Sequence, residues 1–224
     1  GTRMNSDLPK VLHEIAGAPM LVHAMKAGAS LSPERTVVVA GHGADQVEKA
    51  AKTFDPTAEI VLQSEQLGTA HAVQQAQDAL KDFAGDALVL YGDTPFIRPE
   101  TLAAMAAARL THDVVVLGFD AADPGRYGRL IMQEDQLDRI VEFKDATDEE
   151  RKVKLCHRSV IAVNANLPFE LLSPVSNQNA SQEYYLTDII AIARAGGLTA
   201  TVVHCDEHET LGAHSVDESA NAEA

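Results

Sequence analysis

Residues 87–92 read Ala87-Leu88-Val89-Leu90-Tyr91-Gly92, and Asp93-Thr94-Pro95 follow directly. An apolar run that ends in glycine is typical of a buried strand. In an open α/β sheet, ligands bind beyond the carboxyl ends of the strands, and a carboxylate there suits a Mg²⁺ ion bound to phosphates. The alternative is an ordinary Asp-Thr-Pro turn. We favour a functional Asp93 because the strand before it is so apolar.

The same alternation continues on both sides of this stretch. Strands are expected at 36–41, 59–63, 87–92 and 113–119, and helices at 44–54, 68–80 and 99–110. Strands that alternate with helices imply crossover connections, and hence a mostly parallel sheet with helices on both faces. Gly41, Gln63 and Gly92 would then lie at the carboxyl ends of the strands, where such sheets bind ligands.

The pattern changes after residue 120. The sequence predicts a hairpin of strands 129–132 and 136–141 with its turn at Glu134-Asp135, a strand at 159–164, a helix at 186–195 and a strand at 199–204. The hairpin indicates an antiparallel sub-region folded over the parallel sheet. We assign residues 1–215 to one domain and residues 216–224 to an acidic tail or the start of a linker helix.

The composition excludes several classes of function. The chain has 224 residues, of which 46% are hydrophobic, and its formal net charge is −15. Such a charge argues against non-specific binding to nucleic acid or to an anionic membrane, because both need a basic surface. No apolar run approaches the roughly 20 residues that span a bilayer, and no signal peptide is visible. The two cysteines form no disulfide framework, so we expect a cytoplasmic protein.

The first ten residues carry groups that can bind a nucleoside triphosphate. Gly1 lets backbone N–H groups approach phosphate oxygens closely, and Arg3 and Lys10 can neutralise the charge on a leaving pyrophosphate. The alternative is an ordinary terminus that happens to hold one arginine and one lysine. A loop of this kind normally follows a buried strand, so we expect a strand before Gly1 that is either cut away or disordered.

A second candidate site follows the strand at 59–63. The amide of Gln63 offers both a donor and an acceptor, which suits the edge of a pyrimidine base. Gly68 lets the backbone approach a flat ring, and Thr69 adds a hydroxyl and is expected to cap the helix that begins there. Simple helix capping is the alternative, and for Thr69 alone it is the better one.

A third candidate site would bind a sugar. Gly128 allows a sugar to lie against the backbone, and Glu142 can accept hydrogen bonds from sugar hydroxyls. Tyr184 and Tyr185 could line the same pocket or only pack. We also count Thr187 among the substrate-binding candidates. Either Thr187 or its neighbour Asp188 is expected to cap the following helix. A hairpin with a surface carboxylate is the alternative for Gly128 and Glu142.

Six stretches in order resemble one family, the uridyltransferase domain of bacterial bifunctional N-acetylglucosamine-1-phosphate uridyltransferase/glucosamine-1-phosphate acetyltransferase. They are GTRM with LPKVLHEIAGAPML, LQSEQLGTAHA, LYGDTP, GRYGRL, IVEFKDATDEER and QEYYLTDI, and they cover nearly the whole chain to about residue 211. The resemblance implies a Rossmann-like nucleotidyltransferase fold. It also implies that UTP and N-acetylglucosamine 1-phosphate react to give UDP-N-acetylglucosamine and pyrophosphate, with Mg²⁺, or Mn²⁺ in its place, as the cofactor.

The resemblance also assigns residues to roles. It implies that Arg3 and Lys10 contact phosphates and that Asp93 binds Mg²⁺. Gln63, Gly68 and Thr69 would hold the uracil, and Tyr91 and Gly92 would line the sugar-nucleotide site. Gly128 and Glu142 would hold the N-acetylglucosamine. The phosphate of the sugar would attack the α-phosphorus of UTP in line. That oxygen is already ionised, so catalysis would consist of alignment and charge neutralisation.

The sequence departs from the family pattern at two ligand positions. His157 stands where the family has an asparagine that contacts the sugar, and His214 stands where the family has the asparagine that is the second metal ligand. Histidine nitrogen is poorly suited to Mg²⁺. These departures leave two alternatives open: a nucleotidyltransferase for another sugar 1-phosphate, and a non-catalytic fragment or pseudoenzyme that binds a sugar nucleotide.

The resemblance makes statements about partners as well. The chain ends before any hexapeptide β-helix, so the family's acetyltransferase half and its trimer contacts are expected to be missing. This piece would then be a monomer, and a trimer would form only if the native chain has a β-helix half. Small-molecule substrates are the expected partners, without nucleic acid or membrane.

Overall fold

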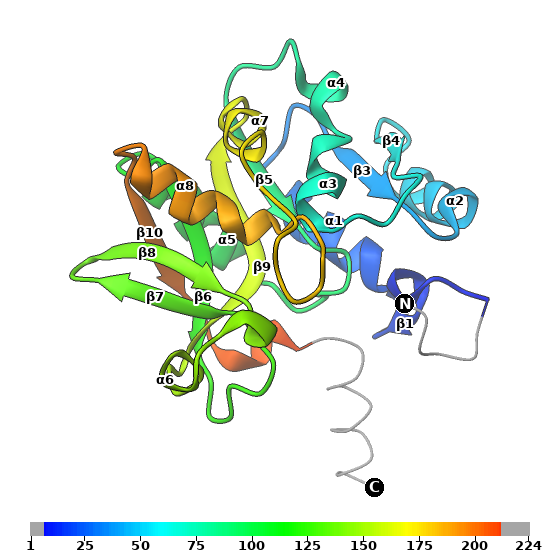
Figure 1. The fold of residues 1–224 in the computed structure, drawn as a ribbon. Coiled ribbons are helices and arrows are strands. Elements are labelled where there is room, and N and C mark those ends of the chain that lie inside the picture. The colour runs from blue at the N-terminus through cyan, green and yellow to red at the C-terminus, as the bar shows by residue number, and fades with distance from the viewer. Residues whose placement is uncertain (1–6, 212–224) are drawn as a thin grey trace, which may run out of the picture.

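The computed structural model describes residues 7–211, in which strands and helices alternate as far as β6 (Figure 1). The helices are α1 (Met20–Ala29), α2 (Ala44–Phe54), α3 (Thr69–Gln74), α4 (Gln77–Leu80), α5 (Pro99–Arg109), α6 (Asp148–Arg151), α7 (Leu167–Leu172) and α8 (Ile189–Ala195). The strands are β1 (Glu14–Ile15), β2 (Ala18–Pro19), β3 (Val37–Ala40), β4 (Glu59–Leu62), β5 (Asp86–Leu90), β6 (Val114–Asp120), β7 (Arg129–Gln133), β8 (Gln136–Val141), β9 (Leu155–Asn164) and β10 (Ala200–His204).

The largest sheet is mixed. Its strand order is β10-β6-β9-β7-β8, and β5 also pairs with β9. β10 runs parallel to β6, whereas β9 runs antiparallel to β5, β6 and β7. β3 and β4 form a parallel pair of their own, in which Ala40 lies opposite Leu62, so Gly41 and Gln63 follow at the same end of that pair.

The expected fold class is confirmed, with one difference in how the strands pair. β5, β6 and β10 point the same way, as alternation with helices predicts, but β9 inserts antiparallel between β5 and β6. β9 also begins at Leu155 and not at residue 159. The polar pair His157 and Arg158 interrupts the apolar pattern there, yet the pairing with β6 includes His157, because ladder bonds join backbone groups whatever the side chain is.

Two predicted helices are shorter or divided. The expected helix at 68–80 is α3 followed by α4, with a turn at Gln75 and Ala76 between them. The expected helix at 186–195 begins as a 3-10 turn (Leu186–Asp188) and becomes α-helical only from Ile189. By contrast, α2, α5 and the β7–β8 hairpin lie where the sequence predicts them, within one residue at each end.

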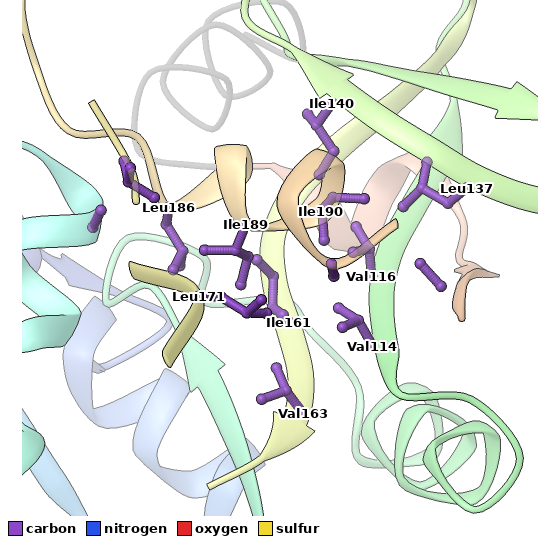
Figure 2. Packing of buried hydrophobic residues seen from close by; sticks show 14 of the residues in the cluster. Val114, Val116, Leu137, Ile140, Ile161, Val163, Leu171, Leu186, Ile189 and Ile190 are labelled. Atoms are coloured by element: carbon purple, nitrogen blue, oxygen red, sulfur yellow. The ribbon is translucent and has the colours of Figure 1, made fainter. Parts of the chain in front are cut away.

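Helices cover both faces of the mixed sheet, which buries a core on each face. Alternate side chains of β6 face opposite ways: Val114 and Val116 pack with α7 and α8, whereas Val115 and Leu117 pack with α1 and α5. Figure 2 shows the first of these clusters, in which residues of α8 lie against β6 and β9. The alternation follows from the two-residue period of a strand. Among residues 7–211, no helix is long and apolar enough to cross a membrane.

The packing of α5 gives a test of the core. Leu102 is fully buried in α5, whereas Leu110, just beyond its end, is 83% exposed. We expect Leu102→Ala to lower the free energy of unfolding by about 2–5 kcal/mol, because a cavity remains where the side chain was. Leu110→Ala should change it by less than about 0.5 kcal/mol. Urea denaturation of both variants measures the difference, and equal effects would contradict the assigned packing.

Candidate active site

Lys10 and Asp93 lie in contact at the carboxyl end of β5. The Nζ atom of Lys10 is 3.3 Å from Oδ2 of Asp93, and both side chains are about three-quarters buried, with exposed fractions of 28% and 24%. Lys10 opens a 3-10 turn whose Leu12 is buried. Gly92 lets this turn approach the strand, because a Cβ atom there would lie 3.2 Å from Val11. The structure thus brings together two of the residues predicted to act on phosphates.

The second carboxylate oxygen of Asp93 is available to a ligand. Oδ1 is buried and has no hydrogen-bond partner among the described residues. Buried polar atoms are normally paired, so an unpaired carboxylate oxygen fits a bound cation. No group of three or more His, Cys, Asp or Glu side chains within residues 7–211 could hold a metal ion. The second predicted ligand, His214, lies outside the described residues, as does Arg3.

Tyr91 lies where the predicted nucleotide and sugar regions meet. Its hydroxyl hydrogen-bonds to Thr69, and the charges of Glu142, Asp93 and Arg158 all act on it. Burial raises the pKa of Tyr91 to about 12, so the phenol stays protonated at neutral pH. Tyr91 therefore contributes a neutral hydroxyl and an aromatic wall to the site.

The predicted uracil residues lie in a loop whose polar groups bond to one another. Nε2 of Gln63 donates to the carbonyl of Gly68 at 3.2 Å and lies 3.0 Å from Nδ1 of His71. Gln66 in turn donates to the carbonyl of Gln63 at 3.2 Å. Gln63 itself is buried. His71, which the sequence analysis did not single out, therefore helps to orient the glutamine.

Backbone bonds clamp this loop to the segment that holds the paired tyrosines. Tyr184 donates from its N–H to Leu67 and accepts from Ala70, both at 2.9 Å. Gly68 makes this approach possible, since its φ is +117° and a Cβ atom there would lie 2.5 Å from the carbonyl oxygen of Tyr184. The expectation that the Thr69 side chain caps α3 is wrong. Its hydroxyl accepts from the N–H of Leu186 at 2.9 Å.

The predicted sugar residues come together from three elements. The hydroxyl of Thr187 donates to Oε1 of Glu142 at 2.9 Å, and the N–H of His157 donates to the carbonyl of Gly128 at 2.9 Å. The expectation that Thr187 or Asp188 caps the helix is wrong, because neither side chain makes a capping bond and the Thr187 hydroxyl is engaged by Glu142. Burial raises the pKa of Glu142 above its usual range.

Gly128 differs from Gly68 in what surrounds it. A Cβ atom on Gly128 would meet Ile140 at 3.4 Å and Oε2 of Glu142 at 3.5 Å, which is ordinary van der Waals contact. Its φ is not among the positive values of the chain. The protein therefore does not need a glycine here for its own packing, and the buried backbone of Gly128 lies directly beside the Glu142 carboxylate.

His157 is buried at the edge of this cluster. Burial, together with the charge of Arg158, lowers the pKa of His157 to about 4, against the smaller opposing effect of a hydrogen bond to the backbone of Leu117. The imidazole is therefore neutral at physiological pH. Arg158, which the sequence did not single out as a site residue, donates from Nε to the carbonyl of Thr210 at 3.1 Å.

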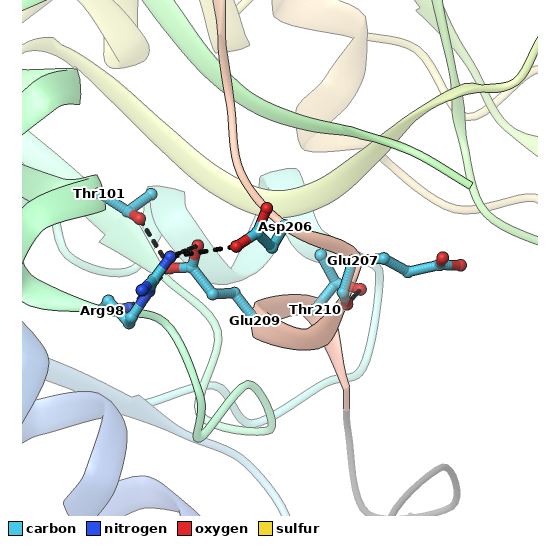
Figure 3. Close-up of polar contacts among 6 residues, drawn as sticks. All are labelled: Arg98, Thr101, Asp206, Glu207, Glu209 and Thr210. Carbon is cyan, nitrogen blue, oxygen red and sulfur yellow. Dashed lines mark hydrogen bonds and ion pairs between the residues drawn. The ribbon is translucent and has the colours of Figure 1, made fainter. Parts of the chain in front are cut away.

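A buried carboxylate joins the segment after β10 to the start of α5. Oε1 of Glu209 accepts from the N–H of Arg98 at 2.9 Å and from the hydroxyl of Thr101 at 2.6 Å, and the Arg98 guanidinium pairs with Glu209 and with Asp206 (Figure 3). A negative charge at a helix N-terminus is stabilising. Because α5 follows the loop of Asp93, this contact fixes that loop from its far end.

Two surface hollows lie away from the Lys10–Asp93 contact. One is lined mainly by residues 33–36 and 54–59, and the other by Phe96, Arg98, Asp206, His208 and Glu209. Neither contains Tyr91, Glu142 or Gly128. The candidate site is thus neither of these hollows, and we define it by the polar groups that come together around Tyr91.

Comparison with protein families matches residues 1–163 to the MobA-like NTP transferase domain. The chain belongs to this family. As the sequence motifs predict, it is a nucleotidyltransferase domain, and its curated relatives are bifunctional GlmU proteins. That of Cereibacter sphaeroides (strain ATCC 17025) is 63% identical over 224 residues, and that of Roseobacter denitrificans is also 63% identical. All of this chain is covered, but only 49% and 50% of those relatives, so the chain spans about half their length.

Solved structures share the fold at low sequence identity. A nucleoside-diphosphate-sugar pyrophosphorylase from Vibrio cholerae RC9 has a TM-score of 0.75 and 16% identity, over 97% of this chain and 92% of that one. An inositol-1-phosphate CTP transferase from T. maritima has a TM-score of 0.72 and 16% identity, over 91% and 79%. At such identities the likeness concerns the fold alone.

The clamp at Gly68 predicts a large loss of stability on substitution. Gly68→Ala should lower the free energy of unfolding by at least about 2 kcal/mol more than Gly17→Ala does. Both glycines have positive φ, but a Cβ atom on Gly17 would meet nothing within 4 Å, so Gly17→Ala introduces no clash, whereas Gly68→Ala adds both a clash and an alanine in a region essentially restricted to glycine. Urea denaturation compares the two variants. Equal losses would show that contact with Tyr184 adds nothing.

The buried imidazole predicts an acid-sensitive fold. Because the pKa of His157 falls from 6.5 to about 4 on folding, the unfolded chain binds more protons below pH 6.5, and stability is lost as the pH falls toward 4. The contribution of His157 to this loss between pH 7.5 and pH 4.5 is about 2–3 kcal/mol. His157→Asn should lose correspondingly less over that range in urea denaturation. An identical pH dependence in both proteins would contradict the assigned burial.

Proposed function

We propose that this domain transfers a uridylyl group from UTP to N-acetyl-α-D-glucosamine 1-phosphate, giving UDP-N-acetylglucosamine and pyrophosphate. One observation carries the proposal. Asp93, which pairs with Lys10, and Glu142, which binds Thr187, both act electrostatically on Tyr91, so groups for phosphates and groups for a sugar converge near one residue. The similarity to bifunctional GlmU proteins supports the proposal.

The chemistry requires alignment and charge neutralisation. An ionised oxygen of the sugar phosphate attacks the α-phosphorus of UTP, a new P–O bond forms, and the bond to the bridging oxygen of pyrophosphate breaks. No proton has to be removed from the nucleophile, so no general base is needed. Lys10 is proposed to neutralise the negative charge that develops on the phosphates, and its contact with the carboxylate of Asp93 supports this role. Arg3 is proposed to assist, although it lies outside the described residues.

A divalent ion is the expected cofactor, and we propose Mg²⁺, with Mn²⁺ as a substitute. Asp93 would hold it through the oxygen that has no partner within the described chain, and the ion would supply further charge neutralisation on the phosphates. His214 is the proposed second ligand from the sequence pattern. The pairing of Asp93 with Lys10 in the free protein suits this arrangement, because phosphates can take over Lys10 when they bind.

On the sugar side, Glu142 is the proposed acceptor for sugar hydroxyls. Thr187 fixes Oε1 by a hydrogen bond, whereas Oε2 lies on the side of Gly128. Gln63, Gly68 and Thr69 are proposed to form the wall that contacts the uracil. We propose that the enzyme is cytoplasmic and acts on small molecules, and that this domain by itself is a monomer.

A related candidate is transfer to a different sugar 1-phosphate. It is favoured by His157, whose buried and neutral ring stands at the sugar cluster in place of the asparagine of the family pattern. An imidazole offers different hydrogen bonds from an amide. Sugar choice depends on few contacts, so this single change could alter it.

Removal of the Asp93 carboxylate tests the proposed activity. Asp93→Asn should lower kcat at least about 100-fold, because a preorganised charge at the reacting phosphate is lost. Pyrophosphate release from UTP and N-acetylglucosamine 1-phosphate, with Mg²⁺ present, is the measurement. Asp78→Asn removes an exposed carboxylate elsewhere and should leave the rate unchanged.

The unsubstituted domain decides between the alternatives in the same assay. Turnover only with another sugar 1-phosphate would favour the related candidate. An intact chain with no turnover that still binds UDP-N-acetylglucosamine would show a non-catalytic binding domain. Wild-type rates in Asp93→Asn would overturn the role of that carboxylate.

A further inference from the structure

Arg129 is a charged residue that the fold buries without a carboxylate partner in the described part of the chain. It is 3% exposed, and its guanidinium donates only to backbone carbonyls. The acceptors are Pro124 at 3.3 Å, Gly125 at 3.1 Å and Arg151 at 3.1 Å, together with a close contact to Tyr127. A buried charge that neutral acceptors alone satisfy is costly, so its position calls for an explanation other than stability.

Three of the four carbonyls that Arg129 binds belong to the loop directly before Gly128. Pro124, Gly125 and Tyr127 all lie in that loop, and the planar fork of a guanidinium can hold several acceptors at fixed angles. The carbonyl of Gly128 itself is held by the N–H of His157 at 2.9 Å. The peptide units before and after Gly128 are therefore fixed independently, one by Arg129 and one by β9.

The same guanidinium also lies against the residue that follows Glu142. The Arg129 Cζ atom is 5.8 Å from the centre of the Phe143 ring, and the Cζ atom of Arg151 is 4.1 Å from it. Arg151 donates to the carbonyl of Phe143 at 2.9 Å and 3.2 Å. Because Arg129 binds the carbonyl of Arg151 as well, it links the loop of Gly128 to the turn of Glu142.

We propose that Arg129 is a positioning residue for sugar recognition. It sets the spacing between Gly128 and Glu142, the two residues proposed to contact the sugar, and does not touch the sugar itself. The inference rests on the proposed function of that cluster. If so, binding of the sugar phosphate depends on Arg129, whereas binding of UTP does not. Within the described residues, none of the hydrogen bonds of the Arg129 side chain goes to the predicted uracil loop.

Arg129→Lys tests this role with the charge retained. An ammonium group cannot bind acceptors of the loop and of Arg151 at once in a planar fork. We expect the KM for the sugar 1-phosphate to rise about tenfold or more, as is typical when a residue that orients a ligand group is lost. The KM for UTP should stay within about twofold. Neither KM depends on the fraction of folded enzyme, so a merely structural defect would move neither.

Arg126→Lys is the matched control. Arg126 lies 5.6 Å from the same Phe143 ring but is exposed, and no hydrogen bond of its side chain is found among the described residues. It should leave both KM values unchanged. Gly128→Ala, which places a methyl group 3.5 Å from Oε2 of Glu142, should raise the KM for the sugar 1-phosphate in the same way as Arg129→Lys and serves as the positive comparison.

The outcomes separate this inference from the proposed function. If the wild-type domain turns over and Arg129→Lys leaves both KM values unchanged, or raises both equally, Arg129 does not position the sugar site. If the wild-type domain does not turn over, the proposed function fails, and calorimetric binding of UDP-N-acetylglucosamine against UTP tests Arg129 in the same variants. If Arg129→Lys does not fold, Phe143→Leu removes the ring on which the guanidinium lies, and the same selective rise is expected.

Discussion

The position of β9 between β5 and β6 is the constraint on which the candidate site depends. β9 pairs with β5 over residues 160–164 and with β6 between residues 155 and 163, and its first residues lie past the end of β5, where residue 156 meets β7. The register with β6 shifts between Val116 and Gly118, opposite residues 157–161, and such irregularities re-aim side chains next to binding sites. The strand thereby brings His157 and the β7–β8 hairpin to the edge where Asp93 lies. A purely parallel sheet would have left the sugar cluster without a connection to β5.

Around that edge, backbone bonds do most of the positioning. Tyr184 holds the loop of Gly68, Leu186 binds the hydroxyl of Thr69, and His157 holds the carbonyl of Gly128. Side chains act mainly as links between these segments, as Glu209 does for the start of α5. A site built in this way is rigid before the substrate arrives, which reduces the entropy that binding has to overcome.

The two glycines of the site illustrate why a residue type does not by itself reveal a role. From the sequence, a ligand is predicted to approach the backbone at both Gly68 and Gly128. In the structure, a Cβ atom on Gly68 would clash with the backbone of Tyr184, whereas one on Gly128 would make ordinary contacts with Ile140 and Glu142. The hydroxyls of Thr69 and Thr187 differ from expectation for a similar reason. Each binds a segment distant in sequence in place of capping its own helix, because a tertiary partner lies closer.

The sequence by itself determined the elements with a clear period and the residue types of the site. α2, α5 and the β7–β8 hairpin are local, since period and turn chemistry suffice to form them. Only the tertiary structure decided that β9 lies antiparallel between β5 and β6, that Lys10 meets Asp93 across 83 positions, and that Arg129 is buried among carbonyls. The reason is physical: pairing and burial depend on which distant segments meet, and no local pattern of side chains encodes that choice.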